Sequence, residues 1–520
     1  MDLIQSIKNL FKRGGYALAG LELKTLNDHP KINIDPKELA RIKSSFSEYR
    51  GDHPQIEYFN SQGKLEKRDY MYINMMKLSA ELLSGLVFNE QCEINISANK
   101  AEGTGTDSLS DAHKFIEHVF EHNDFKKNLM RYLEPTFATG GLTVRPYVNH
   151  DNGEIEFSWA LADAFYPLRS NSNGISEGVM IFTTTKMKEK KTIYYTLLEF
   201  HEWKNDKYIV KNELYKSSNA SEIGKETLLS EIYDEMEETA EINGLSRPNF
   251  NYLKPAGFNN ISPLSPLGLG ITDNSKPTLR KINNTYDQFN WEIEMGQRTV
   301  FVNDSVLQTM PAENGKPPKQ VFDPKVNVYK SMRMSDKEKA IVDVTGDIRT
   351  QQYIAAINQS LKTLEMQLQL SVGTFSFDGK SVKTATEIVS ENSLTYRTRN
   401  NHVNEVEKFI KGLIVSVLEL AKFTNLKEGK RLYTGEIPSF EHIGVDFDDG
   451  IFTDKEAQLN FYGKAKSLGF IPAVEAIQRV FKVPKEVAED WVRQMEAEQF
   501  AMDPMEIANR SSQSMFGNSE

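Results

Sequence analysis

Gly379, Lys380 and Ser381 are the residues of this 520-residue chain that most resemble a catalytic motif. A phosphate-binding loop needs a second glycine five positions before Gly379, so that backbone amides surround the phosphates while the lysine reaches them. That position is Thr374, and the nearest glycine, Gly373, is one residue too early. The motif also follows a predicted helix, whereas a phosphate-binding loop follows a buried strand. The sequence therefore disfavours nucleotide binding here and favours an ordinary flexible loop.

Two further groups contain residue types that bind metals. His118 and His122 are four residues apart, so their imidazoles could share a helix face. The catalytic glutamate of the zinc-protease arrangement and an evident third ligand are missing, so a solvated helix face is the favoured interpretation. The acidic run Glu235–Glu241 would hold a cation only if the fold gathered its carboxylates, and such runs are usually solvated. The sequence supports no enzyme class, no metal site and no cofactor.

The elements that would position these residues lie between 277 and 423. Apolar residues at alternating three- and four-residue spacing predict amphipathic helices over 277–298 and 347–370. Their candidate N-caps are Ser275 and Asp347. Two such helices could pack along each other.

The segments around these helices have other patterns. Residues 299–346 contain short β-prone runs around a proline-rich turn, which predicts a small β-containing insert. Residues 371–386 are predicted to be a loop. Thr384 and Glu387 have the spacing of a capping box, so a third long helix is expected to begin at 387, polar in its first half and apolar in its second.

The rest of the chain divides by composition. Residues 1–135 have mainly helical patterns, and strand-like runs between 140 and 216 predict an antiparallel β meander. Residues 432–447 could return a strand or two to that β region. Three short helices are predicted within 453–500, and 501–520 are tail-like.

Composition limits the classes of function. The single cysteine, Cys92, excludes an internal disulfide framework and indicates folding in a reducing cytosol. A net charge of −11 disfavours a protein that grips nucleic acid with a basic face. It is compatible with an acidic channel wall that repels a sliding duplex. No apolar run is long enough to span a bilayer, and the amphipathic segment 1–15 is expected to dock on protein rather than on a membrane.

The order of these elements resembles the portal proteins of long-tailed, siphovirus-like bacteriophages. The resemblance is carried by the helix, the insert, the second helix, the loop, the Lys383–Glu387 segment and the long helix. Three outlying segments are similar too: Asp163–Pro167, Phe447–Ile451 and Gly469–Pro472. The resemblance covers nearly the whole chain and depends on this order rather than on one motif.

The resemblance implies an α+β, predominantly helical ring subunit that is not an enzyme. Residues 1–276 and 387–452 would form the wing, 277–298 and 347–370 the stem, 299–346 the clip, 371–386 the tunnel loop, 453–500 the crown and 501–520 a flexible tail. About twelve copies, or thirteen in isolation, would form a homo-oligomer at one capsid vertex of the virion. The subunits would be made in the bacterial host cytoplasm.

The same resemblance implies the partners. The ring would pass double-stranded DNA during packaging and ejection and would nucleate head assembly. It would bind the terminase large subunit, a head–tail adaptor, and the major capsid and scaffolding proteins. No membrane is implied.

Ten residues are candidates for the channel. In the loop, two lysines could contact phosphates briefly and three apolar side chains could pack against neighbouring loops: Lys380, Lys383, Phe375, Phe377 and Val382. Three glutamates on polar helix faces could form a negative channel wall or, equally, intersubunit ion pairs: Glu292, Glu294 and Glu365. Arg397 and Arg399 could contact DNA or bind an adjacent subunit.

Two alternatives stay open on the residues alone. A packaging-motor ATPase would hydrolyse ATP and lose activity when Lys380 is changed, and the misplaced glycine argues against it. Another ring-forming neck or tail protein would not bind a terminase, and only the resemblance separates it from a portal protein.

Overall fold

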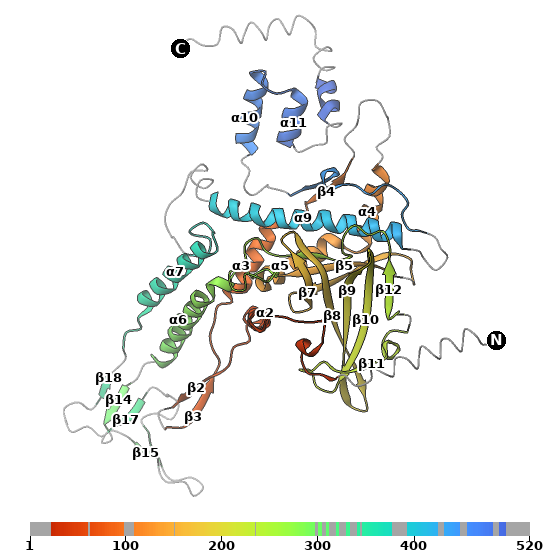
Figure 1. The fold of residues 1–520 in the computed structure, drawn as a ribbon. Coiled ribbons are helices and arrows are strands. Elements are labelled where there is room, and N and C mark those ends of the chain that lie inside the picture. Colours follow the sequence, from red (N-terminus) through yellow and green to blue (C-terminus); the bar gives the residue numbers. More distant parts are fainter. Residues whose placement is uncertain are drawn as a thin grey trace, which may run out of the picture. The chain divides into compact units, whose positions relative to one another are not determined.

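The computed structural model contains two compact units, Met1–Asp448 and Asp449–Glu520, which are considered separately. The residues described are 22–60, 63–97, 109–149, 151–234, 236–296, 300–303, 308–310, 319–321, 329–332, 341–343, 346–376, 393–424, 431–447, 455–481 and 488–495. Figure 1 shows the elements of both units.

Helices dominate the N-terminal part of the first unit, as the sequence predicts. They are α2 (Pro36–Arg50), α3 (Met75–Val87), α4 (Ser110–His122) and α5 (Phe125–Thr139). Helix α2 begins after Asp35, whose side chain accepts a hydrogen bond from the Lys37 amide, and ends at Gly51, where φ is +75°. A hairpin of β2 (Ile56–Phe59) and β3 (Leu65–Arg68) lies between α2 and α3 in the sequence.

A long helix, α9 (Ser393–Phe423), crosses this part of the unit (Figure 1). Its apolar half, which includes Ile410, Leu413 and Leu418, packs with α3, α4 and α5 in the largest hydrophobic cluster. The predicted start of this helix at 387, with its capping box, lies outside the described residues.

The strands between 140 and 253 form two antiparallel sheets rather than the one predicted meander. The larger sheet has the order β1-β11-β10-β9-β8-β7, with β12 also paired to β10. Its strands are β1 (Glu22–Leu23), β7 (Phe165–Asn171), β8 (Gly174–Lys188), β9 (Lys191–Lys204), β10 (Lys207–Ser217), β11 (Gly224–Thr227) and β12 (Thr239–Ile242).

The smaller sheet has the order β13-β5-β6 and consists of β5 (Leu142–Val148), β6 (Ile155–Leu161) and β13 (Asn251–Leu253). Consecutive residues at the start of β5 are buried because helices α5 and α9 pack against it. A strand covered in this way belongs to the helical core, and the turn at 162–164 then leads into β7 of the other sheet.

The two predicted long helices are present as α6 (Lys276–Met295) and α7 (Thr350–Gln367), and they pack along each other. Leu279 and Ile282 of α6, with Leu361 and Leu364 of α7, carry the apolar stripes into the core. Ser275 occupies the N-cap position of α6, as predicted, although its side chain makes no cap hydrogen bond. The prediction of Asp347 as a cap is wrong, because α7 begins after Arg349.

Short strands occupy the insert between α6 and α7, as predicted. A sheet of order β17-β14-β18 contains β14 (Val300–Asn303), β17 (Tyr329–Met332) and β18 (Ile341–Asp343). Strands β15 (Gln308–Met310) and β16 (Lys319–Val321) form a separate antiparallel pair.

The strand expected within 432–447 exists but does not join the β region. It is β19 (Ile443–Asp446), which pairs with β4 (Glu93–Ile96) beside α4. The second unit contains α10 (Lys455–Ser467), α11 (Ala473–Phe481) and a helical segment at 488–495. Within the described parts of both units, no helix combines the length and the apolar character needed to cross a membrane.

Candidate functional site

The structure describes the predicted loop only at its start, residues 371–376. Lys380, Lys383, Phe377 and Val382 lie outside the described residues, as does the serine of the Gly-Lys-Ser motif. Phe375 is within them and is half-buried against the main core cluster. Its side chain therefore helps to fix the start of the loop within its own subunit.

Glu365 is fully buried, which corrects its assignment to a polar helix face. Its carboxylate accepts hydrogen bonds from the backbone amides of Gly373 (3.2 Å) and Ser376 (2.7 Å) and from the Ser376 hydroxyl (3.0 Å). The amide of Phe375 also donates to it. A buried carboxylate needs such donors because it has lost its water, and here the donors all come from the beginning of the loop.

The start of the loop is also held by α9. The Thr395 hydroxyl accepts a hydrogen bond from the Ser371 amide (2.9 Å), and the Thr398 hydroxyl donates to the carbonyl of Gln369 (2.7 Å). These contacts hold the beginning of α9 against the end of α7. We call Glu365, Ser371, Ser376, Thr395 and Thr398 the loop anchor.

Glu292 joins the two paired helices at the end nearest the β insert. The Arg349 guanidinium donates to it from Nη2 (2.6 Å) and Nε (3.1 Å), and the Tyr353 hydroxyl donates at 2.8 Å. The hydrogen bonds from Arg349, followed by the one from Tyr353, lower the pKa of Glu292 to about 2. Glu292 thus forms an ion pair within the subunit, whereas Glu294 is exposed.

The two candidate arginines of α9 differ in position. Arg397 is exposed. Arg399 is buried, and its Nε donates to the Leu86 carbonyl at 2.7 Å. Because that carbonyl belongs to the last turn of α3, Arg399 stabilises a helix end within its own chain. This corrects its assignment as a residue for DNA or a neighbouring subunit.

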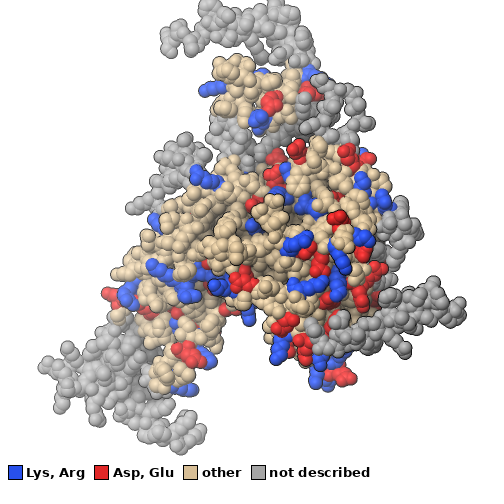
Figure 2. Space-filling model, in the orientation of Figure 1, with Lys and Arg blue, Asp and Glu red and all other residues tan. Residues whose placement is uncertain are grey.

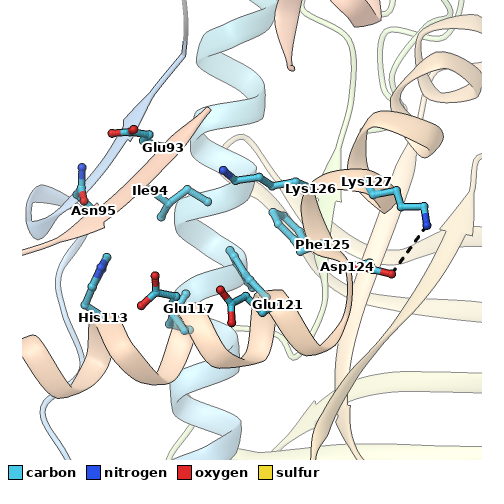
Figure 3. A pocket seen from close by; sticks show the side chains of 12 residues that line it. Glu93, Ile94, Asn95, His113, Glu117, Glu121, Asp124, Phe125, Lys126 and Lys127 are labelled. Atoms are coloured by element: carbon cyan, nitrogen blue, oxygen red, sulfur yellow. Dashed lines mark ion pairs between the residues drawn. The ribbon is translucent and has the colours of Figure 1, made fainter. Parts of the chain in front are cut away.

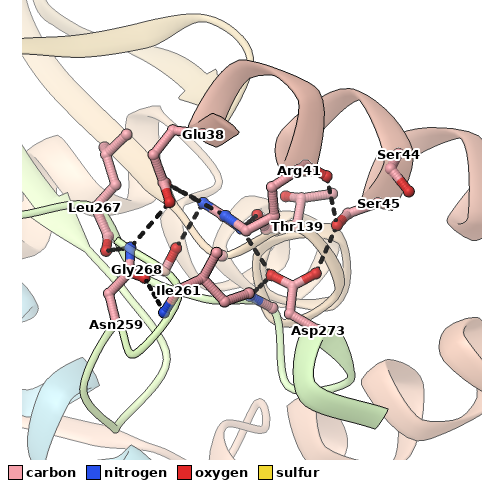
Figure 4. A network of polar contacts seen from close by, with 12 residues as sticks. Glu38, Arg41, Ser44, Ser45, Thr139, Asn259, Ile261, Leu267, Gly268 and Asp273 are labelled. Atoms are coloured by element: carbon pink, nitrogen blue, oxygen red, sulfur yellow. Dashed lines mark hydrogen bonds and ion pairs between the residues drawn. The ribbon is translucent and has the colours of Figure 1, made fainter. Parts of the chain in front are cut away.

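A buried polar network fixes the segment that leads into α6 (Figure 4). Arg41 of α2 binds Asp273 through Nη1 (2.7 Å) and Glu38 through Nη2 (2.8 Å). Burial alone would lower the pKa of Arg41, but its hydrogen bond to Glu38 and the charge of Asp273 raise it above the usual value. Ser45 donates a further hydrogen bond to Asp273 at 2.7 Å. No sequence pattern predicts this network, because Asp273 is more than two hundred residues from Arg41 and Ser45.

Two glycines allow the chain to approach closely beside this network. Gly140 has φ of +100°, and a Cβ there would lie 2.5 Å from the carbonyl oxygen of Gly268. A Cβ at Gly270 would lie 2.1 Å from the carbonyl oxygen of Ala138. The end of α5 and the segment before α6 therefore fit together only because neither position carries a side chain.

A cavity of about 670 Å³ lies between β4, α4 and α5 (Figure 3). Its walls include the carboxylates of Glu93, Glu117 and Glu121, with Lys126 and Lys127 at one end. His118 is directed elsewhere and forms a contact of 3.1 Å with Glu154. Among the residues that the structure describes, no three His, Cys, Asp or Glu side chains gather into a metal site.

The surface carries both signs of charge. On the face shown in Figure 2, basic and acidic side chains are interspersed over both the sheet and the helices. Such a surface differs from the continuous basic face of a protein that grips nucleic acid tightly.

The sequence of this chain matches a known protein family. The sequence pattern of the family described as "Phage portal protein, SPP1 Gp6-like" matches residues 28–500. A chain in a solved structure titled "Virion of native gene transfer agent (GTA) particle" is 9% identical, with 91% of this chain and 98% of that chain covered and a TM-score of 0.39. A similarity of that size does not support a conclusion about the fold or the function. No curated protein matches.

Proposed function

This chain belongs to the SPP1 Gp6-like family of phage portal proteins, and we propose that it forms a ring through which double-stranded DNA enters and leaves a capsid. The observation that carries the proposal is the family match, which includes α6, the β insert, α7 and α9. Portal proteins are structural components of the virion, and the family is not one of enzymes. The proposed ring contains about twelve copies, or thirteen in isolation.

In this proposal each segment has one role. Residues 1–276 and 387–452 form the wing, α6 and α7 the stem, 299–346 the clip, 371–386 the tunnel loop and 453–500 the crown. The clip binds the terminase large subunit during packaging and a head–tail adaptor afterwards. The wing and crown face the major capsid and scaffolding proteins during head assembly. The subunits are made in the bacterial host cytoplasm.

The loop anchor supports the role of the tunnel loop. Glu365 holds residues 373–376, and Thr395 and Thr398 hold the beginning of α9. The start of the loop and the described beginning of α9 are therefore both fixed at the end of α7. We propose that Lys380 and Lys383 make brief contacts with DNA phosphates, while Phe377 and Val382 pack against neighbouring loops.

The charged residues of the stem have separate roles in the proposal. Glu294 is exposed and contributes to a negative channel wall, which repels the duplex and disfavours long-lived contacts. Glu292 instead keeps α6 and α7 aligned through Arg349. Arg397 is exposed and is available for DNA or for an adjacent subunit.

Electron microscopy of the purified chain, combined with its mass in solution, tests the proposal. We expect closed rings of about twelve or thirteen copies with a central channel. Co-expression with the scaffolding and major capsid proteins covers the case in which ring closure needs them. A chain that stays monomeric in both preparations and hydrolyses ATP would overturn the proposal.

A further inference from the structure

The β2–β3 hairpin is attached to α6 through one of its two faces. The register pairs Tyr58 with Glu66 and Ile56 with Arg68. These side chains are partly buried, whereas Glu57, Phe59, Leu65 and Lys67 alternate with them and are exposed. The hairpin thus has an inner face on α6 and an outer face in solvent.

A cluster of polar and aromatic contacts holds the inner face. The Arg68 guanidinium binds both carboxylate oxygens of Asp287, at 2.7 and 2.6 Å, and lies over the Trp291 ring at 4.6 Å. Tyr58 packs edge-on against Trp291, with ring centroids 4.9 Å apart. The Met71 amide, just after β3, also donates to Asp287 at 3.0 Å. We call these contacts the clamp. A two-stranded hairpin is only marginally stable alone, so the direction of this hairpin depends on the clamp.

The outer face ends in apolar side chains. Phe59 and Leu65 are directly opposite each other across the two strands and are 74% and 48% exposed. We call Phe59 and Leu65 the apolar tip.

The opposite flank of α6 faces α7. Successive helix residues turn by about 100°, so Phe289 and Glu292 lie roughly opposite Asp287. These two residues contact Tyr353 of α7. Helix α6 therefore lies between the hairpin and α7 (Figure 1). On the α7 side, Ile354 is 51% exposed, and we call the surface around it the α7 flank.

We infer that the apolar tip of one copy packs against the α7 flank of the next copy in the ring. This inference rests on the proposed function, because a ring of identical copies needs two different surfaces that bind each other head to tail. The tip and the flank lie on opposite sides of α6, as such a ring requires. Each is apolar and exposed in the single chain, and burying both stabilises the contact.

The clamp explains how a small hairpin could contribute to assembly. Because Arg68 and Tyr58 fix the hairpin on α6 before subunits meet, little conformational entropy is lost when the tip docks. The inner-face contacts are independent of Phe59 and Leu65. Changing the tip should therefore leave the folded subunit intact.

The first test replaces the tip. In the double variant F59S/L65S we expect the subunit concentration needed for half-assembly of rings to rise roughly tenfold or more. The control is M187S/F258S, whose side chains are 76% and 72% exposed elsewhere in the same unit. Native mass spectrometry measures assembly, and thermal unfolding of the monomer shows that both variants are folded. Normal assembly of F59S/L65S would overturn the inference.

The second test is a disulfide cross-link. The only native cysteine, Cys92, is buried, and burial raises the pKa of its thiol to about 12, so background oxidation is low. Chains carrying F59C and I354C together should form a ladder of cross-linked subunits. A mixture of singly substituted chains should yield dimers only. M187C with I354C is the control.

The outcomes separate this inference from the proposed function. Rings that form normally without the F59C–I354C cross-link would overturn the tip-to-flank contact and leave the portal function standing. A cross-link within one chain would also overturn it, because α6 separates the two positions. Failure of the unsubstituted chain to form rings, with and without capsid proteins, would count against the proposed function itself.

Discussion

Glu365 of α7 receives two hydrogen bonds from Ser376, one from the backbone amide at 2.7 Å and one from the hydroxyl at 3.0 Å. The two residues are eleven positions apart, and both are buried. A carboxylate in the core therefore determines where the following loop departs from α7. The contact fixes residues that come shortly before the proposed DNA-facing lysines in the sequence.

The variant E365Q should lose part of this anchor. A glutamine amide presents one acceptor oxygen and one donor group to a ring of donors, so we expect the free energy of unfolding to fall by about 1–3 kcal/mol. Urea denaturation of the purified chain measures the change. The control is E294Q on exposed α6 surface, where an effect within about 0.5 kcal/mol is expected. Equal stability of the two variants would show that Glu365 is not an anchor.

The network around Arg41 leads to a second prediction. The variant D273N removes the charge that faces the Arg41 guanidinium at 2.7 Å, and both side chains are buried. Arg41 keeps its buried pair with Glu38 in this variant, but the charge-assisted hydrogen bonds to Asp273 are lost or weakened, so the free energy of unfolding should fall by about 1–3 kcal/mol. The matched control is D52N, whose pair with Arg50 is largely exposed and should contribute about 0–1 kcal/mol. Chemical denaturation of both variants checks the difference, and similar losses would contradict it.

Local patterns predicted the paired helices because burial repeats with the helical period. Leu361, Leu364 and Leu368 mark the buried side of α7, and the same spacing places Glu365 on that side too. The charge of Glu365 alone predicts a polar helix face. Its position within the apolar stripe instead indicates that it is buried.

Other features depend on pairings between distant segments. Strand β5 joins β13, more than a hundred positions later, and β19 joins β4 across an even longer separation. The sequence of a strand does not show which distant strand it pairs with. The sequence patterns therefore predict the wrong sheet for β5 and for β19. For the same reason the sequence does not predict the partners of Arg399 and Arg41. Arg399 binds the Leu86 carbonyl and Arg41 binds the Asp273 carboxylate, and both partners are far away in the sequence.

His402 of α9 predicts a specific pH dependence. Its Nδ1 accepts a hydrogen bond from the Ala256 amide at 3.0 Å, and burial lowers its pKa from 6.5 to about 4. Between these values the unfolded chain binds a proton that the native chain does not, so stability is lost as the pH falls through this window. Below about pH 4 this residue causes no further loss.

The size of this effect can be measured with a glutamine variant. The wild type should lose about 3 kcal/mol through His402 between pH 7 and pH 4, and H402Q should lack that part of the slope. Urea denaturation at several pH values measures it. The control is H118Q, at a histidine whose side chain is 60% exposed, which should keep the wild-type slope. Identical slopes for wild type and H402Q would rule out the mechanism.

The double variant K380A/K383A tests the proposed contact between the tunnel loop and DNA. Removing two positive charges from each copy of the loop should weaken brief phosphate contacts, and we expect packaged DNA per head to fall roughly twofold or more. Ring formation should not change, because the loop anchor contains neither lysine. The charge-matched control is K43A/K77A, which removes two exposed lysines from α2 and α3. If K380A/K383A packages DNA as well as this control does, these lysines do not contact DNA during translocation.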